Sequence, residues 1–203
     1  MSKHFFDILF SFLGIVILSP VVLIISVILL ISSKGKVFFV QRRAGKNNRS
    51  FKLAKFRTMK IVSDNNSLIT IGVRDPRLTN VGYFLRKYKL DELPQLFNIL
   101  KGDMSFVGPR PEVPKYVEFY TEEQKKVLDV RPGLTDYASL KFFDENRILA
   151  EYDNPEKAYI EQVLPEKLNL SLKYIEEQSF LLDLKLIWLT IKRVFTSPKQ
   201  KGT

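Results

Sequence analysis

The 203-residue sequence predicts an α+β protein that is mostly helical and is held at a membrane by its N-terminal helix. Three observations carry this prediction. A long uncharged apolar segment lies near the N-terminus, two short β-type segments flank a polar turn, and apolar residues recur at helical spacing over most of the remainder. We expect two parts, a membrane helix over residues 1–35 and a single further domain over residues 36–203.

Residues 8–31 form a run of 24 residues without a charged side chain. A straight helix of that length reaches roughly 36 Å, which is enough to cross a bilayer. Ser19-Pro20 interrupts the middle of the run, and a proline-bent helix would have two halves of only roughly 18 Å each. The Ser19 hydroxyl could bond a carbonyl that the proline leaves free. These residues alone leave a spanning helix and a re-entrant helix, which enters and leaves by the same face, equally favoured.

The segment after this run is strongly basic. Residues 34–60 contain ten Lys or Arg and no Asp or Glu. Because positively charged flanks of membrane segments stay in the cytoplasm, we expect the following domain on the cytoplasmic face. The same charges attract anionic phospholipid headgroups. The net charge of +10 for the whole chain indicates an anionic partner, which could be nucleic acid, anionic lipid or a phosphorylated substrate.

Two residue types that carry much enzyme chemistry are scarce in this chain. There is no Cys, and the single His is His4. Disulfides, a Cys nucleophile, a Ser-His-Asp triad and a multi-His metal site are therefore excluded. A bound metal would need oxygen ligands, as Mg²⁺ does.

The remaining elements follow from local patterns. Residues 37–40 and 50–56 read as strands of a small β-hairpin, with residues 41–48 as the turn. Helical spacing predicts helices over residues 79–87 and 93–100 and a mostly helical segment over residues 112–130. Residues 131–135 read as a turn, and residues 150–178 as helix interrupted at Pro155 and Pro165.

The last predicted helix, over residues 180–195, is strongly amphipathic. Its apolar side carries Leu181, Leu184, Ile187, Trp188, Ile191 and Phe195. Such a stripe packs into a core or lies in the membrane interface, and Trp188 with the basic C-terminal end favours the interface. We therefore expect amphipathic interfacial helices beside the membrane segment.

Two adjacent acids, Asp91 and Glu92, are the leading catalytic candidates. Asp91 suits the N-cap of the helix that follows, since Pro94 is tolerated in a first turn, and a purely structural cap is the alternative. Arg86 precedes the pair, and a helix N-terminus itself attracts anions. A diphosphate with Mg²⁺, which would bridge a carboxylate and phosphate oxygens, would balance these charges, and an ionised Asp can attack phosphorus directly.

Four further residues are candidates for binding phosphate. Arg110 lies in a stiff loop between two prolines, the second being Pro111, and arginine suits bidentate phosphate contact. A structural salt bridge is the alternative role for Arg110. Lys55 and Arg57 add two cations around Phe56, where an exposed strand edge is the alternative.

Together these motifs resemble the monotopic phosphoglycosyl transferases, a bacterial sugar transferase family. The residues that carry the resemblance are Ser19-Pro20, Gln41-Arg-Arg-Ala-Gly45, Lys55-Phe-Arg-Thr-Met59, Leu85-Arg-Lys87, Leu90-Asp-Glu-Leu-Pro-Gln95, Asn98-Ile-Leu-Lys-Gly-Asp-Met-Ser-Phe-Val-Gly-Pro-Arg-Pro111 and Arg131-Pro-Gly-Leu-Thr135. They occur in one order from the N-terminus to about residue 140, which makes the match specific. The length is similar to that of the small single-domain members.

The resemblance implies a two-step reaction on the cytoplasmic face of the bacterial inner membrane. Asp91 would attack the β-phosphate of a UDP-sugar, release UMP and hold the phosphosugar covalently. Undecaprenyl phosphate would then accept the phosphosugar, the first membrane step in building a polysaccharide or glycoprotein glycan. The resemblance also implies Mg²⁺ at Asp91, Glu92 completing a dyad, phosphate contacts by Arg110 and Arg86, and a re-entrant helix broken at Ser19-Pro20.

The chain departs from the family pattern after Thr135. Many members continue with Gly-Trp-Ala and Asn-Gly-Arg, whereas residues 136–145 here read Asp-Tyr-Ala-Ser-Leu-Lys-Phe-Phe-Asp-Glu. Contacts to the sugar and the base are therefore not carried over, and the sequence specifies neither the sugar, the pathway nor whether the chain forms a homo-oligomer. No nucleic-acid partner is expected.

Three alternative functions remain. The acid pair could act only through Mg²⁺ in a direct one-step transfer. The chain could instead be a membrane-tethered basic protein that binds anionic lipid or nucleic acid without catalysis, or a structural membrane scaffold. Neither of the last two would need the carboxylates of Asp91 and Glu92.

Overall fold

The structure is a computed structural model that describes residues 3–32, 36–60, 72 and 75–196. Helices dominate these residues, and their strands form two separate two-stranded sheets, which confirms the α+β, mostly helical class. The helices are α1 (Lys3–Ser32), α2 (Asn80–Lys87), α3 (Gln95–Leu100), α4 (Pro114–Val117), α5 (Tyr137–Lys141), α6 (Glu145–Leu149), α7 (Pro155–Ala158), α8 (Leu164–Glu177) and α9 (Phe180–Thr196). The strands are β1 (Phe38–Ala44), β2 (Ser50–Phe56), β3 (Ser105–Val107) and β4 (Gly133–Thr135).

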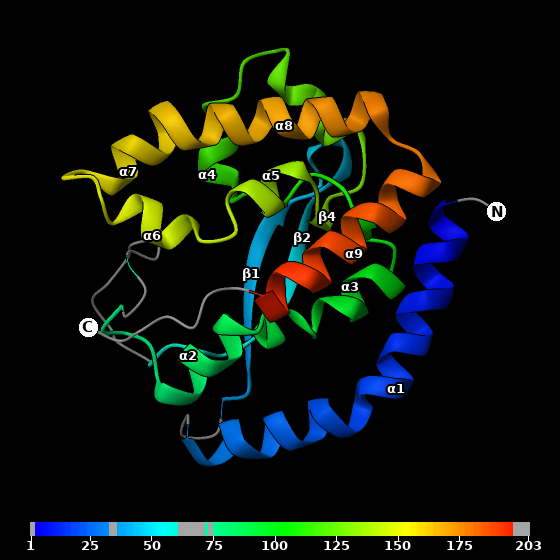
Figure 1. Cartoon of the computed structure of the whole chain (residues 1–203), viewed down its shortest axis with the longest axis vertical. Coiled ribbons are helices and arrows are strands. Elements are labelled where there is room, and N and C mark those ends of the chain that lie inside the picture. Colours follow the sequence, from blue (N-terminus) through cyan, green and yellow to red (C-terminus); the bar gives the residue numbers. More distant parts are fainter. Residues whose placement is uncertain (1–2, 33–35, 61–71, 73–74, 197–203) are drawn as a thin grey trace.

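Helix α1 is bent in its middle, and Figure 1 shows its two limbs meeting at an open angle. Pro20 lies inside the helix and has no N–H to donate to the Val16 carbonyl one turn earlier. The Ser19 hydroxyl donates to that same carbonyl at 2.8 Å, as the sequence predicted. By length and composition the helix could cross a membrane, and only 11% of its most apolar stretch is buried.

Both limbs of α1 rest on the rest of the protein. Near the start of the helix, Lys3 forms an ion pair with Asp183 of α9. Near its end, Leu29 packs with Phe56 of β2 and Leu85 of α2 in one buried cluster. The bent helix therefore follows the body of the protein at both ends rather than leaving it, as Figure 1 illustrates.

The predicted hairpin is present, but its turn is shorter than expected. Strands β1 and β2 pair antiparallel from Phe38 opposite Phe56 to Ala44 opposite Ser50. Residues 41–44, predicted as part of the turn, instead extend β1, because their pairing with β2 continues as far as Ala44. The Ala44 N–H also donates to the carbonyl of Glu112, in the loop after β3. The reversal itself is confined to a short 3₁₀ turn, η1 (Lys46–Asn48).

The prediction of a plain turn over residues 131–135 is wrong. Residues 133–135 form β4, which pairs in parallel with β3. The two strands approach at Gly108 and Gly133, where a Cβ added to Gly133 would lie 2.1 Å from the Gly108 nitrogen. Only glycine permits this backbone contact, and a three-residue strand is too short to leave a periodic pattern in the sequence.

The helical segments after β3 also differ in part from the predictions. Residues 112–130 are less helical than expected, with α4 and a 3₁₀ segment, η3 (Gln124–Asp129). Thr121 marks the start of the latter, since its side chain and that of Gln124 each accept the other's backbone N–H. The helix predicted to start at residue 150 begins only at Pro155, with α7, because residues 150–154 form turns. Pro165 does not interrupt the helix, since a π-turn, η4 (Tyr159–Val163), joins α7 to α8.

Helix α9 leaves its predicted apolar side uncovered. Leu181, Trp188 and Phe195 are 77%, 64% and 78% exposed. The helix packs inward through Leu186 and Asp183 instead, which are both buried. An apolar stripe left outside a packed helix favours the interfacial alternative over the core-packing one.

Candidate active site

Asp91 and Glu92 lie in a 3₁₀ turn, η2 (Leu90–Glu92), between α2 and α3. The preceding Lys89 adopts a left-handed backbone with φ of 55°, a conformation that is costly for a residue with a side chain and common at functional sites. The prediction that Asp91 is a helix N-cap is wrong. Helix α3 begins only at Gln95, after a further turn through Pro94, so the acid pair precedes it by one turn.

The Asp91 carboxyl group is buried and incompletely satisfied. The residue is 5% exposed, and its Oδ1 has no hydrogen-bond partner among the described residues. Burial raises the pKa of Asp91, whereas the nearby charges of Lys55, Lys89 and Arg86 lower it. A buried carboxylate oxygen without a partner is costly and points to a group that is ready to contact something else.

Glu92, by contrast, is fully engaged. Its Oε1 accepts from Lys55 Nζ at 2.9 Å and from Arg110 Nη2 at 2.6 Å, and its Oε2 lies 3.4 Å from Arg110 Nη1. Burial alone would raise the pKa of Glu92, but Arg110 and Lys55 together hold it well below its usual range. Two predicted phosphate-binding cations therefore meet at this one carboxylate.

Short polar and backbone contacts fix where the cations sit. Asn98 of α3 clamps β2, since its Oδ1 accepts from the Ala54 N–H at 3.1 Å and its Nδ2 donates to the Lys52 carbonyl at 2.8 Å. This clamp holds the strand that carries Lys55 against the acid pair. The contact of β3 with β4 likewise fixes the start of the loop that carries Arg110.

Arg86 reaches the pair from α2. A Cβ on Gly82 would lie 2.0 Å from the Thr58 carbonyl oxygen, so glycine lets α2 rest directly on that backbone. Arg86 Nε then donates to Thr58 Oγ1 at 2.9 Å. Asp91 is the strongest nearby charge acting on the pKa of this guanidinium, which burial lowers and Asp91 raises.

The structure does not bring every predicted site residue to the acid pair. Arg57 lies at the base of the hairpin, where Nη2 donates to the Phe38 carbonyl at 3.4 Å and the guanidinium sits over the Phe39 ring. Pro111 contributes its backbone, since its carbonyl accepts from Arg43 at 3.1 Å. The phosphate role predicted for Arg57 has no support in this geometry.

An apolar groove of about 520 Å³ lies in the bend of α1, between this helix and α3. Ser19 and Pro20, at the helix bend, line it. Its other lining residues are Ile15, Val22, Leu23, Ser26, Leu93, Leu96 and Phe97. Leu93 follows the acid pair directly, so the groove begins next to Asp91 and Glu92.

The donor set for a metal ion is limited. The described residues contain no cluster of three or more His, Asp or Glu side chains that could hold an ion. Mg²⁺ is commonly bound by one or two carboxylates together with substrate phosphates, and the unpartnered Oδ1 of Asp91 fits that mode. Glu92 fits it poorly, because its oxygens are occupied by Lys55 and Arg110.

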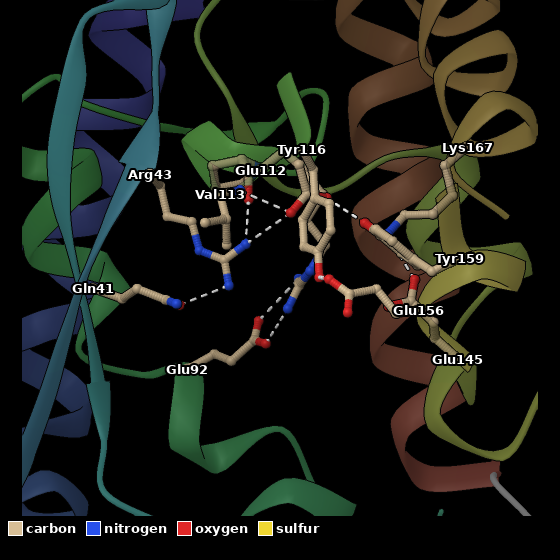
Figure 2. Close-up of polar contacts among 12 residues, drawn as sticks. Gln41, Arg43, Glu92, Glu112, Val113, Tyr116, Glu145, Glu156, Tyr159 and Lys167 are labelled. Carbon is tan, nitrogen blue, oxygen red and sulfur yellow. Dashed lines mark hydrogen bonds and ion pairs between the residues drawn. The ribbon is translucent and has the colours of Figure 1, made fainter. Parts of the chain in front are cut away.

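Sequence reasoning missed a buried polar network behind Arg110, which Figure 2 shows. It links β1, the loop after β3, α6, η4 and α8. Its labelled members are Gln41, Arg43, Glu112, Tyr159, Lys167 and Glu145. Gln41 and Arg43 occur in a motif noted above and Glu112 directly follows Pro111, but nothing in the sequence marks Tyr159 or Lys167.

The segment that departs from the family pattern has a structural role at its start. Asp136 is fully buried and caps α5, because its Oδ1 accepts from the Ser139 N–H at 2.7 Å. Its Oδ2 accepts from the Ser171 hydroxyl at 2.6 Å. Glu145, at the end of the segment, belongs to the network behind Arg110 through Lys167.

Fold and site together define a mostly helical α+β protein with a buried acid pair, several cations and a long apolar helix beside them. The family model for bacterial sugar transferases matches residues 1–197. The chain belongs to this family.

Three relatives illustrate the range of similar proteins. UDP-glucose:undecaprenyl-phosphate glucose-1-phosphate transferase of Escherichia coli K12 is 35% identical over 200 residues, covering 97% of this chain and 41% of that protein. UDP-N-acetylgalactosamine-undecaprenyl-phosphate N-acetylgalactosaminephosphotransferase of Aeromonas hydrophila is also 35% identical, over 96% of this chain and 44% of that protein. An uncharacterized sugar transferase of Bacillus subtilis strain 168, EpsL, is 35% identical over 96% of this chain and 88% of its own length.

Several of the curated relatives with a stated activity are much longer than the matched region. The chain spans 36% to 44% of the Komagataeibacter xylinus, Escherichia coli and Aeromonas hydrophila proteins. Family membership rests on the match over residues 1–197. The activity and the substrates of this chain are argued from its own residues.

Proposed function

We propose that this protein transfers a phosphosugar from a UDP-sugar to undecaprenyl phosphate, forming undecaprenyl-diphosphate-sugar and releasing UMP. The observation that carries the proposal is that a buried Asp91, whose Oδ1 has no hydrogen-bond partner among the described residues, adjoins a carboxylate that pairs with Lys55 and Arg110. The names of the relatives, which specify undecaprenyl phosphate acceptors and nucleotide-sugar donors, support it.

The proposed first step uses Asp91 as the nucleophile. A carboxylate oxygen of Asp91 forms a bond to the β-phosphorus, the bond from that phosphorus to the bridging oxygen breaks, and UMP leaves with the electron pair. A phosphate oxygen of the lipid acceptor then attacks the same phosphorus and the Asp91 carboxylate leaves. The raised pKa of Asp91 falls when further positive charge is brought near it, which favours the ionised nucleophile.

In this scheme Glu92 positions the side chains of Lys55 and Arg110. A carboxylate whose pKa is held well below its usual range is a weak base, so proton removal from the acceptor is a poor role for Glu92. Lys55 and Arg110 are held in place by Glu92 until the donor phosphates arrive. Preorganised cations of this kind stabilise the charge that develops as the diphosphate is cleaved.

Mg²⁺ would be held by Asp91 together with oxygens of the donor diphosphate. When bound, the ion blunts the repulsion between the carboxylate and the phosphates and polarises the phosphorus that is attacked. We expect turnover to stop on chelation with EDTA and to return on adding Mg²⁺.

The groove in the bend of α1 is the proposed seat for part of the acceptor's polyprenyl chain. It is apolar, it begins beside the acid pair at Leu93, and it is lined by the membrane helix itself. A lipid entering there would bring its phosphate toward Asp91 from the side of the bilayer.

We further propose that α1 is re-entrant and that the catalytic part faces the cytoplasm at the inner membrane. Support comes from the bend at Pro20 and from the contacts that both limbs make with the same body, through Lys3 and Leu29. The chain has no cysteine, so single substitutions His4→Cys and Ser32→Cys allow a direct test. Labelling of both by an impermeant reagent from the cytoplasmic side is expected, and opposite sidedness would contradict re-entry.

The proposed function is tested by reconstituting the full chain in vesicles that contain undecaprenyl phosphate and supplying a panel of UDP-sugars. Formation of undecaprenyl-diphosphate-sugar and UMP in equal amounts is expected with at least one sugar. A chain that binds vesicles or nucleic acid equally well with Asp91→Asn, and forms no product with any donor, would instead be a basic binding protein.

A further inference from the structure

Arg110 reaches the acid pair from a loop that is also held by a second ion pair, between Arg43 and Glu112. Arg43 Nη1 donates to the Pro111 carbonyl at 3.1 Å and to Glu112 Oε1 at 3.3 Å. Its Nη2 donates to Gln41 Oε1 at 2.9 Å. The planar arginine fork therefore fixes the backbone one residue after Arg110 and the side chain of the next residue.

Glu112 is held from its other side by a tyrosine and a lysine. The Tyr159 hydroxyl donates to Glu112 Oε2, and Lys167 Nζ donates to the Tyr159 oxygen at 3.2 Å. Lys167 also pairs with Glu145 Oε2 at 2.6 Å. Figure 2 shows these residues as one continuous set of contacts that reaches from β1 to the helices on the far side.

The charges in this arrangement alternate. Burial lowers the pKa of the Arg43 guanidinium, Glu112 opposes that effect, and the like charge of Arg110 adds to it. Two arginines can stay near each other here because each has its own glutamate, Glu112 for Arg43 and Glu92 for Arg110. A buried ion pair contributes little net stability compared with apolar packing, and in some proteins its benefit is a defined geometry.

We propose that Arg43 and Glu112 are positioning residues that aim the Arg110 guanidinium at the donor phosphates, and that Tyr159 holds Glu112 in the orientation this requires. The inference rests on the proposed function. It predicts that the network affects turnover only through Arg110.

The mildest test is Tyr159→Phe, which removes one hydroxyl and keeps the ring. Tyr174→Phe is a matched control, because Tyr174 is also buried, also donates to a carboxylate, at Asp183 Oδ1, and also contacts a lysine, Lys3. We expect Tyr159→Phe to lower kcat by about tenfold or more, since small misplacements of a binding group are costly in rate. Tyr174→Phe should change kcat by less than about twofold. Its Tm should shift by about as much as that of Tyr159→Phe, because each variant loses one buried hydrogen bond to a carboxylate.

A stronger variant is Glu112→Gln, which breaks the ion pair with Arg43 at nearly constant volume. Its matched control is Asp183→Asn, which breaks the Lys3 ion pair. We expect the Glu112 variant to lose kcat and the Asp183 variant to keep it. Tyr159→Phe keeps the test decisive if Glu112→Gln does not fold, because no charge is left without its partner.

The discriminating measurement is a double-mutant cycle with Arg110→Lys. In that background the guanidinium to be aimed is gone, so Tyr159→Phe should lower kcat by less than about twofold further. Fully additive losses would mean a merely structural network and would overturn the inference, as would equal losses of kcat in the Tyr159 and Tyr174 variants. A wild-type chain without any transfer activity would overturn the proposed function, and this inference with it.

Discussion

The two sides of one short segment, residues 90–100, differ sharply in chemistry. Toward one side Asp91 and Glu92 lie among several cations. Toward the other side Leu93 and Phe97 line an apolar groove in the bend of the membrane helix. In the proposed reaction, this contrast would let one segment serve both a water-soluble donor and a lipid acceptor, because Leu93 of the groove directly follows the acid pair in the sequence.

A second contrast lies within the acid pair itself. Asp91 and Glu92 are neighbours in one 3₁₀ turn, yet the pKa of the first is raised and that of the second is held well below its usual range. Desolvation acts on both, and the difference is that Glu92 has direct ion pairs with Lys55 and Arg110. Groups with opposing perturbations in one site are typical of divided catalytic roles.

The largest expected effect is loss of turnover in Asp91→Asn. An amide cannot form the phosphoenzyme bond, so we expect the rate of undecaprenyl-diphosphate-sugar formation to fall by about a thousandfold or more. The exposed Asp129→Asn removes the same charge from the surface and should leave the rate unchanged. Comparable rates for the Asp91 variant and wild type in vesicles would remove Asp91 from the chemistry.

Stability should respond oppositely to neutralising the two acids. Glu92→Gln leaves two partly buried cations without their carboxylate and should destabilise the protein by about 3 kcal/mol at pH 7. Asp91→Asn removes a desolvated charge and should stabilise it by about 1 kcal/mol. Thermal unfolding in nanodiscs checks both, and shifts of the same sign would contradict the division of roles.

The same pair predicts opposite pH dependences of stability. The lowered pKa of Glu92 gives stabilisation that is present above its ordinary value of about 4.5 and is lost as pH falls through the folded-state pKa. The raised pKa of Asp91 gives a penalty that is complete above the folded-state pKa and is relieved as pH falls from there toward 3.8. The stabilising effect of Asp91→Asn should therefore shrink on acidification, and an effect that grows would contradict the raised pKa.

Arg110→Lys tests the cation side of the site. Lysine keeps the charge but cannot make the two-pronged contact, so kcat/KM for the donor should fall by about tenfold to a hundredfold. Arg42→Lys, at an exposed position of β1, is the matched control and should leave kcat/KM for the donor unchanged. Saturation kinetics over the donor concentration provide the measurement, and an unchanged kcat/KM would assign Arg110 a structural salt bridge only.

The groove side should give the smallest effect. Leu23→Gln places an amide in the groove and should raise the KM for undecaprenyl phosphate about fivefold, since about 1 kcal/mol of apolar contact is lost. Ile24→Gln is a matched control, because Ile24 is similarly exposed but does not line the groove. Equal effects of both on the acceptor would indicate altered membrane insertion instead of a chain-binding groove.

Local features were the ones that the sequence could predict. Pro20 and Ser19 act through the carbonyl of Val16, within one turn, so the bend and its hydroxyl bond are readable from neighbouring residues. The hairpin and the exposed stripe of α9 likewise follow from short-range periodicity. The candidate residues Asp91 and Arg110 stood out because their types and neighbours are unusual together.

Most of the features that could not be predicted depend on residues far apart in the chain, and one depends on the left-handed backbone at Lys89. The contact of Gly108 with Gly133 creates a parallel pair of three-residue strands, which leaves no repeating pattern. Tyr159 of η4 and Lys167 of α8 join the site only through the packing of these two elements, roughly fifty residues beyond Arg110 in the sequence. The capping role expected of Asp91 failed because a left-handed Lys89 starts an additional turn before α3.

The central claim is that Asp91 carries the phosphosugar covalently, and it is tested most directly by a labelling experiment without lipid acceptor. Purified protein, Mg²⁺ and UDP-sugars labelled at the β-phosphate are mixed, and wild type is compared with Asp91→Asn. The account predicts label on wild type, none on the variant, and its removal on adding undecaprenyl phosphate. Unlabelled wild-type protein that nevertheless releases UMP and forms lipid product with the same donor would contradict it and establish direct transfer.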